Sequence, residues 1–228
     1  MQILKYFIDN YDSIIFFDVE TTGLDFRDDE IIEFACIDIK RNGKAICHDF
    51  LVNVHFRLPR EIVNLTHITD EMLVEEGIER SQLAKFIAEE LFNKQKILLL
   101  AHNANFDMNF IKYLFKKEGR KVPWNKIDII DTLTILRDRK EYPHKLENAI
   151  SFYGLDGMVK NSHRAIDDVK AMLMVFDRMS HDNGDVVKYI NLFGYNPKYG
   201  IRENVKLPRV KYEAQRYGEK MKLYEWFE

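Results

Sequence analysis

The sequence contains few of the residues that build secreted or membrane-embedded proteins. Its 228 residues include two cysteines, Cys36 and Cys47, which form no CxxC pair and have no histidines at zinc spacing. No stretch approaches the roughly 18 consecutive apolar residues of a membrane span, and residues 1–5 lack the pattern of a signal peptide. We therefore expect no disulfide scaffold, no secretion and no membrane partner, and we predict a reducing, cytoplasmic location.

Nucleotide-binding loops and common hydrolase signatures are also missing. The sequence contains no GxxxxGK followed by Ser or Thr, no GxGxxG, no GxSxG and no HExxH. The net charge of −3 has the wrong sign to make the chain as a whole attractive to nucleic acid. One segment differs from the rest, because residues 198–222 hold eight Lys or Arg against three Glu, a net charge of +5.

Short apolar runs that alternate with helical patterns predict an α/β fold built on a mixed sheet flanked by helices. The expected strands are residues 13–18, 31–40, 45–52, 97–100 and 127–130. Helical spacing is present at residues 81–92, with Ser81 as N-cap, and at residues 105–117, 132–139, 145–153 and 164–179. The pattern changes after residue 181, so we predict a main domain over residues 1–182 and an extension over residues 183–228.

The second and third expected strands are joined through Asn42-Gly43, the strongest local signal of a β-hairpin. If these two residues are the centre of the turn, Cys36 and Cys47 lie diagonally on one face of the hairpin. We expect both cysteines to fill the core.

Two acids lie at the end of the first expected strand. Ile14, Phe16 and Asp18 share one face of that strand, and we expect Glu20 to share it as well. No Lys or Arg lies within six residues of Asp18 on either side, so the positive charge that buried acids require must come from elsewhere, and a metal ion is one candidate. A solvated strand end is the alternative.

Two further acids lie on the apolar side of expected helices. Asp107 shares its helix face with Phe110, Ile111 and Leu114, although a first-turn carboxylate that favours the helix dipole is the alternative. In the helix expected at residues 164–179, the helical phase places Asp168 on the apolar side and Asp167 on the outer side.

His163 precedes this last helix by one residue. Because residues five apart within one helix diverge by roughly 140°, His163 can share a site with Asp168 only if it precedes the regular helix. Four inward acids with one histidine are hard, oxygen-rich ligands that suit Mg²⁺ or Mn²⁺, and a pair of such ions is typical of phosphodiester chemistry. A zinc site would require more His or Cys ligands.

Three segments carry a family resemblance. FDVETTGL at residues 17–24, HNANFD at residues 102–107 and HRAIDD at residues 163–168 resemble, in that order, the three motifs of the histidine branch of the DEDD 3′→5′ exonucleases, best known from proofreading subunits and domains of bacterial replicative DNA polymerases. The tyrosine branch would need Tyr where Arg164 stands. THITDEML at residues 66–73 is similar to the family's intervening segment, which usually has Gly where His67 or a neighbour stands.

The resemblance implies a ribonuclease H-like fold, a five-stranded mixed sheet flanked by helices, and a catalytic set of Asp18, Glu20, Asp107, His163 and Asp168. It implies that Asp18 bridges two divalent ions, Mg²⁺ or Mn²⁺, that Glu20 and Asp168 complete the site of the ion that activates water, and that Asp107 holds the second ion. His163 would be the general base, a role that suits an imidazole at neutral pH.

Residues around these acids are implied to meet the substrate. Thr21, Thr22, Gly23 and Leu24 would contact the terminal nucleotide, with Leu24 wedged against a base, and Thr66 would contact the sugar. His102 and Asn103 either anchor the backbone of the site or approach the substrate. We expect Phe106 in the core. A basic run, which suits phosphates but is equally consistent with a solvated loop, comprises Arg137, Arg139, Lys140, His144 and Lys145.

We predict a metal-dependent 3′→5′ exonuclease that releases mononucleotides from single-stranded ends. We expect its substrate to be DNA and its partner to be a DNA polymerase or another replication protein. The alternatives are an exoribonuclease of the same superfamily and a noncatalytic docking module. For the C-terminal extension, in which basic residues and aromatic rings alternate, contact with nucleic acid and packing against the domain or a partner both stay open. The nine rings are Tyr189, Phe193, Tyr195, Tyr199, Tyr212, Tyr217, Tyr224, Trp226 and Phe227.

Overall fold

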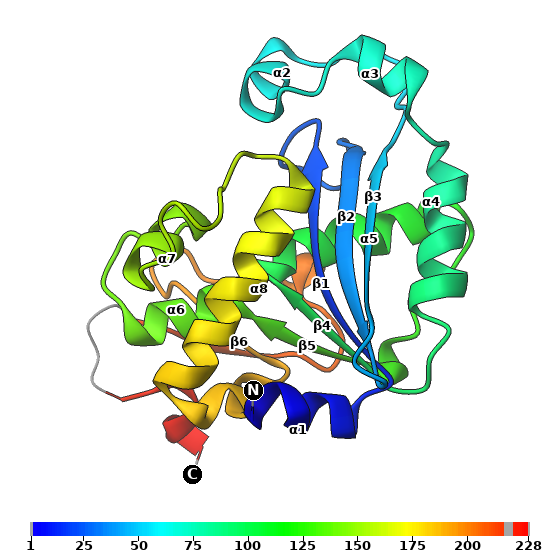
Figure 1. Cartoon of the computed structure of the whole chain (residues 1–228). Coiled ribbons are helices and arrows are strands. Elements are labelled where there is room, and N and C mark those ends of the chain that lie inside the picture. The colour runs from blue at the N-terminus through cyan, green and yellow to red at the C-terminus, as the bar shows by residue number, and fades with distance from the viewer. Residues whose placement is uncertain (1, 217–220, 228) are drawn as a thin grey trace.

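Five strands form the central sheet of this computed structural model, which describes residues 2–216 and 221–227 (Figure 1). Their order is β3-β2-β1-β4-β5, and the ranges are Ser13–Thr21 for β1, Ile31–Lys40 for β2, Ala45–Leu51 for β3, Ile97–Ala101 for β4 and Ile127–Asp131 for β5. β2 pairs antiparallel with β1 and β3, whereas β4 pairs parallel with β1 and β5. The expected mixed sheet is confirmed.

Helices cover both faces of this sheet (Figure 1). Alternation along β1 sends Ile14 and Phe16 into one core with α8 and Ile15 and Phe17 into the other with α4 and α5. The helices are α1 (Gln2–Asn10), α2 (Arg60–Thr66), α3 (Asp70–Glu75), α4 (Arg80–Phe86), α5 (Ala104–Lys117), α6 (Thr132–Arg139), α7 (Leu146–Phe152) and α8 (Ala165–Asp182). Within the described ranges, no helix combines the length and the apolar character needed to cross a membrane.

The start of α4 differs from the expectation. Glu79, and not Ser81, is the N-cap: its side chain and that of Gln82 form a reciprocal capping box, and the helix begins at Arg80. Ser81 is therefore the second helical residue. The helical run continues as a π-helix over Ile87–Leu91.

The hairpin between β2 and β3 corrects the prediction for the cysteines. Gly43 has φ of 80°, and its N–H donates to the Lys40 carbonyl over 2.8 Å, so Arg41 and Asn42 are the central residues of the turn. Because of this one-residue difference, Cys36 pairs with His48 and Cys47 pairs with Ile37. The two cysteines therefore lie on opposite faces of the hairpin. Cys36 is buried as expected, whereas Cys47 is exposed and fills no core.

The C-terminal extension packs against the main domain. Tyr189 and Phe193 are buried, one in each of the two main cores, and Tyr212 and Tyr224 pack edge-on against them. β6 (Leu192–Tyr195) and β7 (Lys211–Ala214) pair in parallel, and short 3-10 turns cover Gly184–Tyr189, Glu203–Val205 and Leu223–Phe227, as Trp124–Lys126 does before β5. Tyr217 and the side chain of Phe227 lie outside the described residues. The boundary near residue 182 stays a prediction.

Candidate active site

The end of β1 carries the first two acids. Asp18 and Glu20 point to the same side of the strand, and β1 remains paired with β2 up to a bulge between Glu20 and Thr21. Both carboxylates are half-buried. The apolar face of β1 therefore ends, as its alternation predicts, in two acids directed to one place.

The first turn of α5 brings Asp107 to this strand end. Asn103 has φ of 76° and turns the chain sharply into the helix. The carboxylate of Asp131, at the end of the neighbouring β5, accepts the N–H groups of Asn103 and Ala104 over 2.9 and 3.2 Å. Asp107 is buried and accepts a hydrogen bond from the backbone N–H of Val19 over 3.3 Å, so α5 contacts β1 between the two acids of the first motif.

The first turn of α8 supplies Asp168. Its carboxylate is buried and accepts the Ser162 N–H over 3.2 Å. Asp167 instead pairs with the Ser162 hydroxyl over 2.8 Å and with Lys170 over 3.7 Å, on the outer side of the helix. The inward direction of Asp168 and the outward direction of Asp167 agree with the helical phase of the sequence.

His163 stands before the helix, as a shared site requires. Arg164 is the N-cap of α8, and His163 before it is exposed with φ of 54°, in the left-handed region. One ligand atom each from Glu20, His163 and Asp168 lie within 4.8 Å of one another. These three side chains can contact a single ion or water molecule.

Burial and mutual repulsion make the ionised acids costly. Burial, followed by the charge of Asp107, raises the pKa of Asp18 well above its ordinary value. Burial also raises the pKa of Asp107, and it raises that of Glu20 to about 8 and that of Asp168 to about 7. Arg164 lowers the pKa of Glu20 but is itself paired with Glu33, which leaves the cluster short of positive charge. Oxygen donors with a charge deficit fit hard divalent cations such as Mg²⁺ and Mn²⁺.

The loop after β1 is tied down by Asp29. The Thr22 hydroxyl donates to the Asp29 carboxylate over 3.0 Å, and the Asp25 N–H donates to it over 2.9 Å. A Cβ added at Gly23 would lie 2.5 Å from the same carboxylate, so a larger residue here would displace Asp29 from these hydrogen bonds. Leu24 is 85% exposed at the tip of the loop, which suits the expected wedge against a base.

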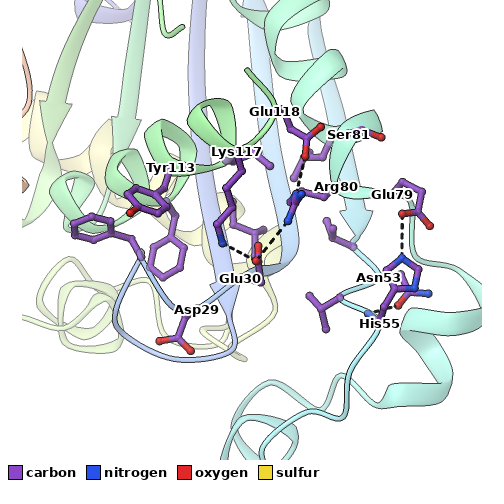
Figure 2. Close-up of a pocket in the computed structure, with 17 residues that line it drawn as sticks. Asp29, Glu30, Asn53, His55, Glu79, Arg80, Ser81, Tyr113, Lys117 and Glu118 are labelled. Carbon is purple, nitrogen blue, oxygen red and sulfur yellow. Dashed lines mark hydrogen bonds and ion pairs between the residues drawn. The ribbon is translucent and has the colours of Figure 1, made fainter. Parts of the chain in front are cut away.

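The far end of this loop is held by ion pairs that Figure 2 shows. Glu30 contacts Lys117 over 2.6 Å and Arg80 over 3.6 Å, and Arg80 also contacts Glu118 over 2.7 Å. These groups line a cavity of about 340 Å³ between the loop, β3, α4 and α5. The loop that presents Leu24 is thereby fixed to α4 and α5.

Comparisons with known proteins agree with this geometry. A sequence model of the family described as Exonuclease matches residues 15–176. The chain belongs to the exonuclease family. The PolC-type DNA polymerase III of Staphylococcus aureus is 37% identical over 171 residues, which are 72% of this chain and 11% of that protein. The chain thus spans about a tenth of the length of the curated relatives that it matches.

Solved exonuclease structures share the fold. Escherichia coli Exonuclease I in complex with a dA16 oligonucleotide has a TM-score of 0.69 at 21% identity, with 78% of this chain and 42% of that chain covered. Exonuclease I from Methylocaldum szegediense has a TM-score of 0.65 at 20% identity, with 78% and 42% covered. The resemblance to DEDD exonucleases, the ribonuclease H-like fold and the enzyme class, a 3′→5′ exonuclease, are confirmed at the level of the family.

The remaining predicted substrate residues of this exonuclease divide into anchored and accessible groups. Both ring nitrogens of His102 are engaged, one with the Thr132 hydroxyl over 3.0 Å and one with the His144 carbonyl over 2.9 Å, which favours the anchoring alternative. Asn103 is exposed beside it. The Thr21 hydroxyl donates to the Gly23 carbonyl over 2.6 Å and so supports the loop from within.

Thr66 ends α2 and serves its own turn. Its hydroxyl donates to the Ile62 carbonyl over 2.9 Å and accepts the Ile68 N–H over 3.2 Å, and the residue is fully buried. His67 follows with φ of 58°, a left-handed C-cap, which is the conformation that favours the glycine usual in the family. Contact between Thr66 and the sugar stays a prediction.

The sequence analysis did not identify three acids that support the site. Glu33 and Asp131 are buried in strands and fix the starts of α8 and α5, while Asp29 fixes the loop after β1. The one available signal was an acid inside an otherwise apolar strand, as in residues 31–35 and 127–131.

Phe106 packs against Phe110 with ring centroids 4.9 Å apart, at the edge of the expected core.

Proposed function

We propose that this chain is a metal-dependent 3′→5′ exonuclease that releases nucleoside monophosphates from the single-stranded 3′ ends of DNA. The observation that carries the proposal is the convergence of Glu20, His163 and Asp168 within 4.8 Å, beside Asp18 and Asp107. Acids with pKa values raised by burial, gathered at one strand end next to an exposed imidazole, are typical of a functional site and suit divalent metal ions.

The residues take the following roles in the proposal. Asp18, Glu20 and Asp168, next to His163, would hold one divalent ion, and Asp18 with Asp107 would hold the second. When bound, the two ions supply Lewis-acid stabilisation of the charge that develops on the phosphate. His163 accepts the proton of the attacking water, and its position outside the helix leaves the imidazole accessible for that transfer.

The choice of DNA rests on the relatives. The matched curated proteins are DNA polymerases of the PolC type, and the solved Exonuclease I structures include a complex with a DNA oligonucleotide. A place beside a DNA polymerase follows from the same likeness and is part of the proposal. A single-stranded end is required because the terminal nucleotide must reach the loop at Leu24, where a base pair would clash with an inserted side chain.

The test is hydrolysis of matched DNA and RNA oligonucleotides, each labelled at the 5′ end. We expect a ladder of products shortened from the 3′ end with Mg²⁺ or Mn²⁺, and none with EDTA. Faster cleavage of RNA would replace the substrate with RNA and leave the mechanism in place. If the oligonucleotides stay intact under every metal condition, the alternative of a noncatalytic docking module would be favoured.

A further inference from the structure

Two cavities meet beside the candidate active site. The first, of about 390 Å³, extends from His163 past His102 to Tyr142 and Lys145. The second, of about 200 Å³, lies between the start of α5 and the C-terminal extension, where Tyr195 and Asn196 line it. Asn103 and Arg137 line both, so the two cavities form one groove that runs from the catalytic histidine to the extension.

The order of the strands places this groove on a defined side of the acids. Asp18 and Glu20 stand at the end of the central strand β1, and the loop that carries Leu24 leads from there towards β2. Asn103 follows β4, and Arg137 lies on α6, which follows β5, on the opposite side of β1. A strand whose terminal nucleotide sits at Leu24 and whose phosphate sits at the acids therefore continues over β4 and β5, along the groove.

Arg137 stands at the junction with unused hydrogen-bonding capacity. Its Nη1 donates to the Gly194 carbonyl over 3.2 Å, and its Nε is buried without a partner among the described residues. Asp131, which also lines the second cavity, accepts backbone N–H groups of Asn103, Ala104 and Leu133 and the Thr134 hydroxyl. A phosphate at this point would meet a guanidinium that forms no ion pair with a carboxylate within residues 2–216 and 221–227.

The far rim of the groove presents a basic residue and an aromatic ring together. A turn over residues 196–200 is closed by the Gly200 N–H, which donates to the Asn196 carbonyl over 3.0 Å, with Gly200 at φ of 64°. Lys198 lies over the ring of Tyr199 at 5.3 Å, and Tyr199 is 77% exposed. At the near end of the groove, Tyr142 is 76% exposed. Exposed rings with nearby cations are the combination that unpaired bases and their phosphates need.

We infer that the C-terminal extension is a second binding surface for single-stranded nucleic acid, continuous with the active site through Arg137. This inference rests on the proposed function, because it identifies the groove as the path of the same strand. The extension has both roles that its sequence left open: Tyr189, Phe193, Tyr212 and Tyr224 pack inward, while Tyr195 and Tyr199 face the groove or solvent.

The experiment compares binding of single strands of about 4 and about 12 nucleotides, lengths within the range of known single-strand sites. Binding is measured by fluorescence anisotropy in EDTA, so that nothing is hydrolysed, at several salt concentrations. The variants of the full chain are Arg137→Gln and the double variant Lys198→Ala/Tyr199→Ala. The matched control is Lys5→Ala/Tyr6→Ala, a Lys-Tyr pair that is also exposed, on α1, which precedes the start of β1, whereas the acids lie at the end of that strand.

We expect the wild type to bind the longer strand more tightly than the shorter one. Each groove variant should weaken binding of the longer strand by about tenfold and the shorter one clearly less, because a lost stacking or phosphate contact has that effect. The salt slope should become shallower by about one unit in the Lys198→Ala/Tyr199→Ala variant. The control should bind both strands as the wild type does.

The inference is overturned if the groove variants bind the longer strand as tightly as the control does, or if both lengths weaken by the same factor. Because binding is measured without catalysis, this outcome is distinct from failure of the proposed function. An inactive wild type that shows the length-dependent loss would support the groove while removing the exonuclease proposal. An active wild type without the length-dependent loss would support the exonuclease proposal and overturn the groove inference.

Discussion

Glu33 accepts two hydrogen bonds from the Arg164 guanidinium, over 2.9 and 2.7 Å, and so joins β2 to the start of α8. Its second oxygen accepts the Ala165 N–H over 2.7 Å. Glu33 is fully buried, and it pairs in register with Glu20 across β1 and β2. One acid therefore connects the strand that carries the first motif to the helix that carries the third.

Glu33→Gln should lower stability and turnover together. Removing the charge of one partner in a buried ion pair costs about 3 kcal/mol, to be measured by urea denaturation. We expect kcat to fall by about tenfold or more with little change in KM, because the start of α8 sets where His163 and Asp168 stand. The exposed Glu61→Gln serves as control. A fall in stability with unchanged kcat would restrict Glu33 to a structural role.

Removing any one of the four acids should abolish turnover while leaving the fold intact. Asp18→Asn, Glu20→Gln, Asp107→Asn and Asp168→Asn preserve side-chain size but weaken the ligand set for the metals. Asp167→Asn is the matched control and should be nearly silent, because Asp167 pairs with Ser162 and Lys170 on the outer side of α8. An inactive Asp167→Asn beside a fully active Asp168→Asn would contradict the assignment.

His163→Ala should lose a factor of about 10² to 10⁴ in rate, which is the contribution of a positioned base. Binding of the oligonucleotide should change less, since the other ligands remain. The wild-type rate should rise with pH, because a general base must be unprotonated to accept the proton of the attacking water. If the variant keeps the pH profile of the wild type, another group is the base.

The metal-free protein should lose stability as the pH rises from about 5 to about 8. The folded-state pKa values of Glu20, about 8, and Asp168, about 7, lie above their ordinary values of 4.5 and 3.8. The folded state therefore binds more protons than the unfolded state in this window, and the free energy of unfolding falls with increasing pH. Melting in EDTA should show this fall, and Mn²⁺ or Mg²⁺ should raise Tm most at the upper end. A Tm that rises across the window in EDTA would contradict the account.

A chain truncated after Ser180 should not fold to a stable, soluble nuclease. The truncation removes Tyr189 and Phe193 from the two main cores, and it removes Asp185, which pairs with the buried side chain of Arg139. Loss of large buried aromatic side chains costs about 3–5 kcal/mol each, which approaches the whole stability of a domain. Soluble expression and a cooperative melt of the truncated chain would show instead that residues 1–180 form an independent unit.

Local pattern was sufficient for the five strands of the main sheet and for the direction of the candidate catalytic side chains. The range of β2 and that of α6 agree with the prediction from end to end, because apolar alternation and helical spacing are read from neighbouring residues. The same periodicity distinguished Asp168 from Asp167 and placed His163 ahead of its helix. Helix α1 was not predicted, although Phe7 is fully buried against Phe176.

Contacts between distant residues were decided by the tertiary structure. A one-residue difference in the turn of the hairpin moved Cys47 to the opposite face from Cys36, because strand faces alternate with a period of two. Within the basic run, Arg139 is bound to Asp185 and to the Met179 carbonyl, while Arg137 faces the groove. Nothing in the spacing of these basic residues distinguishes their directions.

The sequence by itself predicted the candidate acids, the histidine and the family, because each motif is a short segment whose geometry follows from one strand end or one helix start. The tertiary structure decided what holds these segments together: Glu33 for α8, Asp131 for α5 and Asp29 for the loop at Leu24. It also decided that the extension completes the cores and borders the groove. The physical reason is that hydrogen bonds and burial between residues far apart in sequence depend on the packed sheet, which no local window contains.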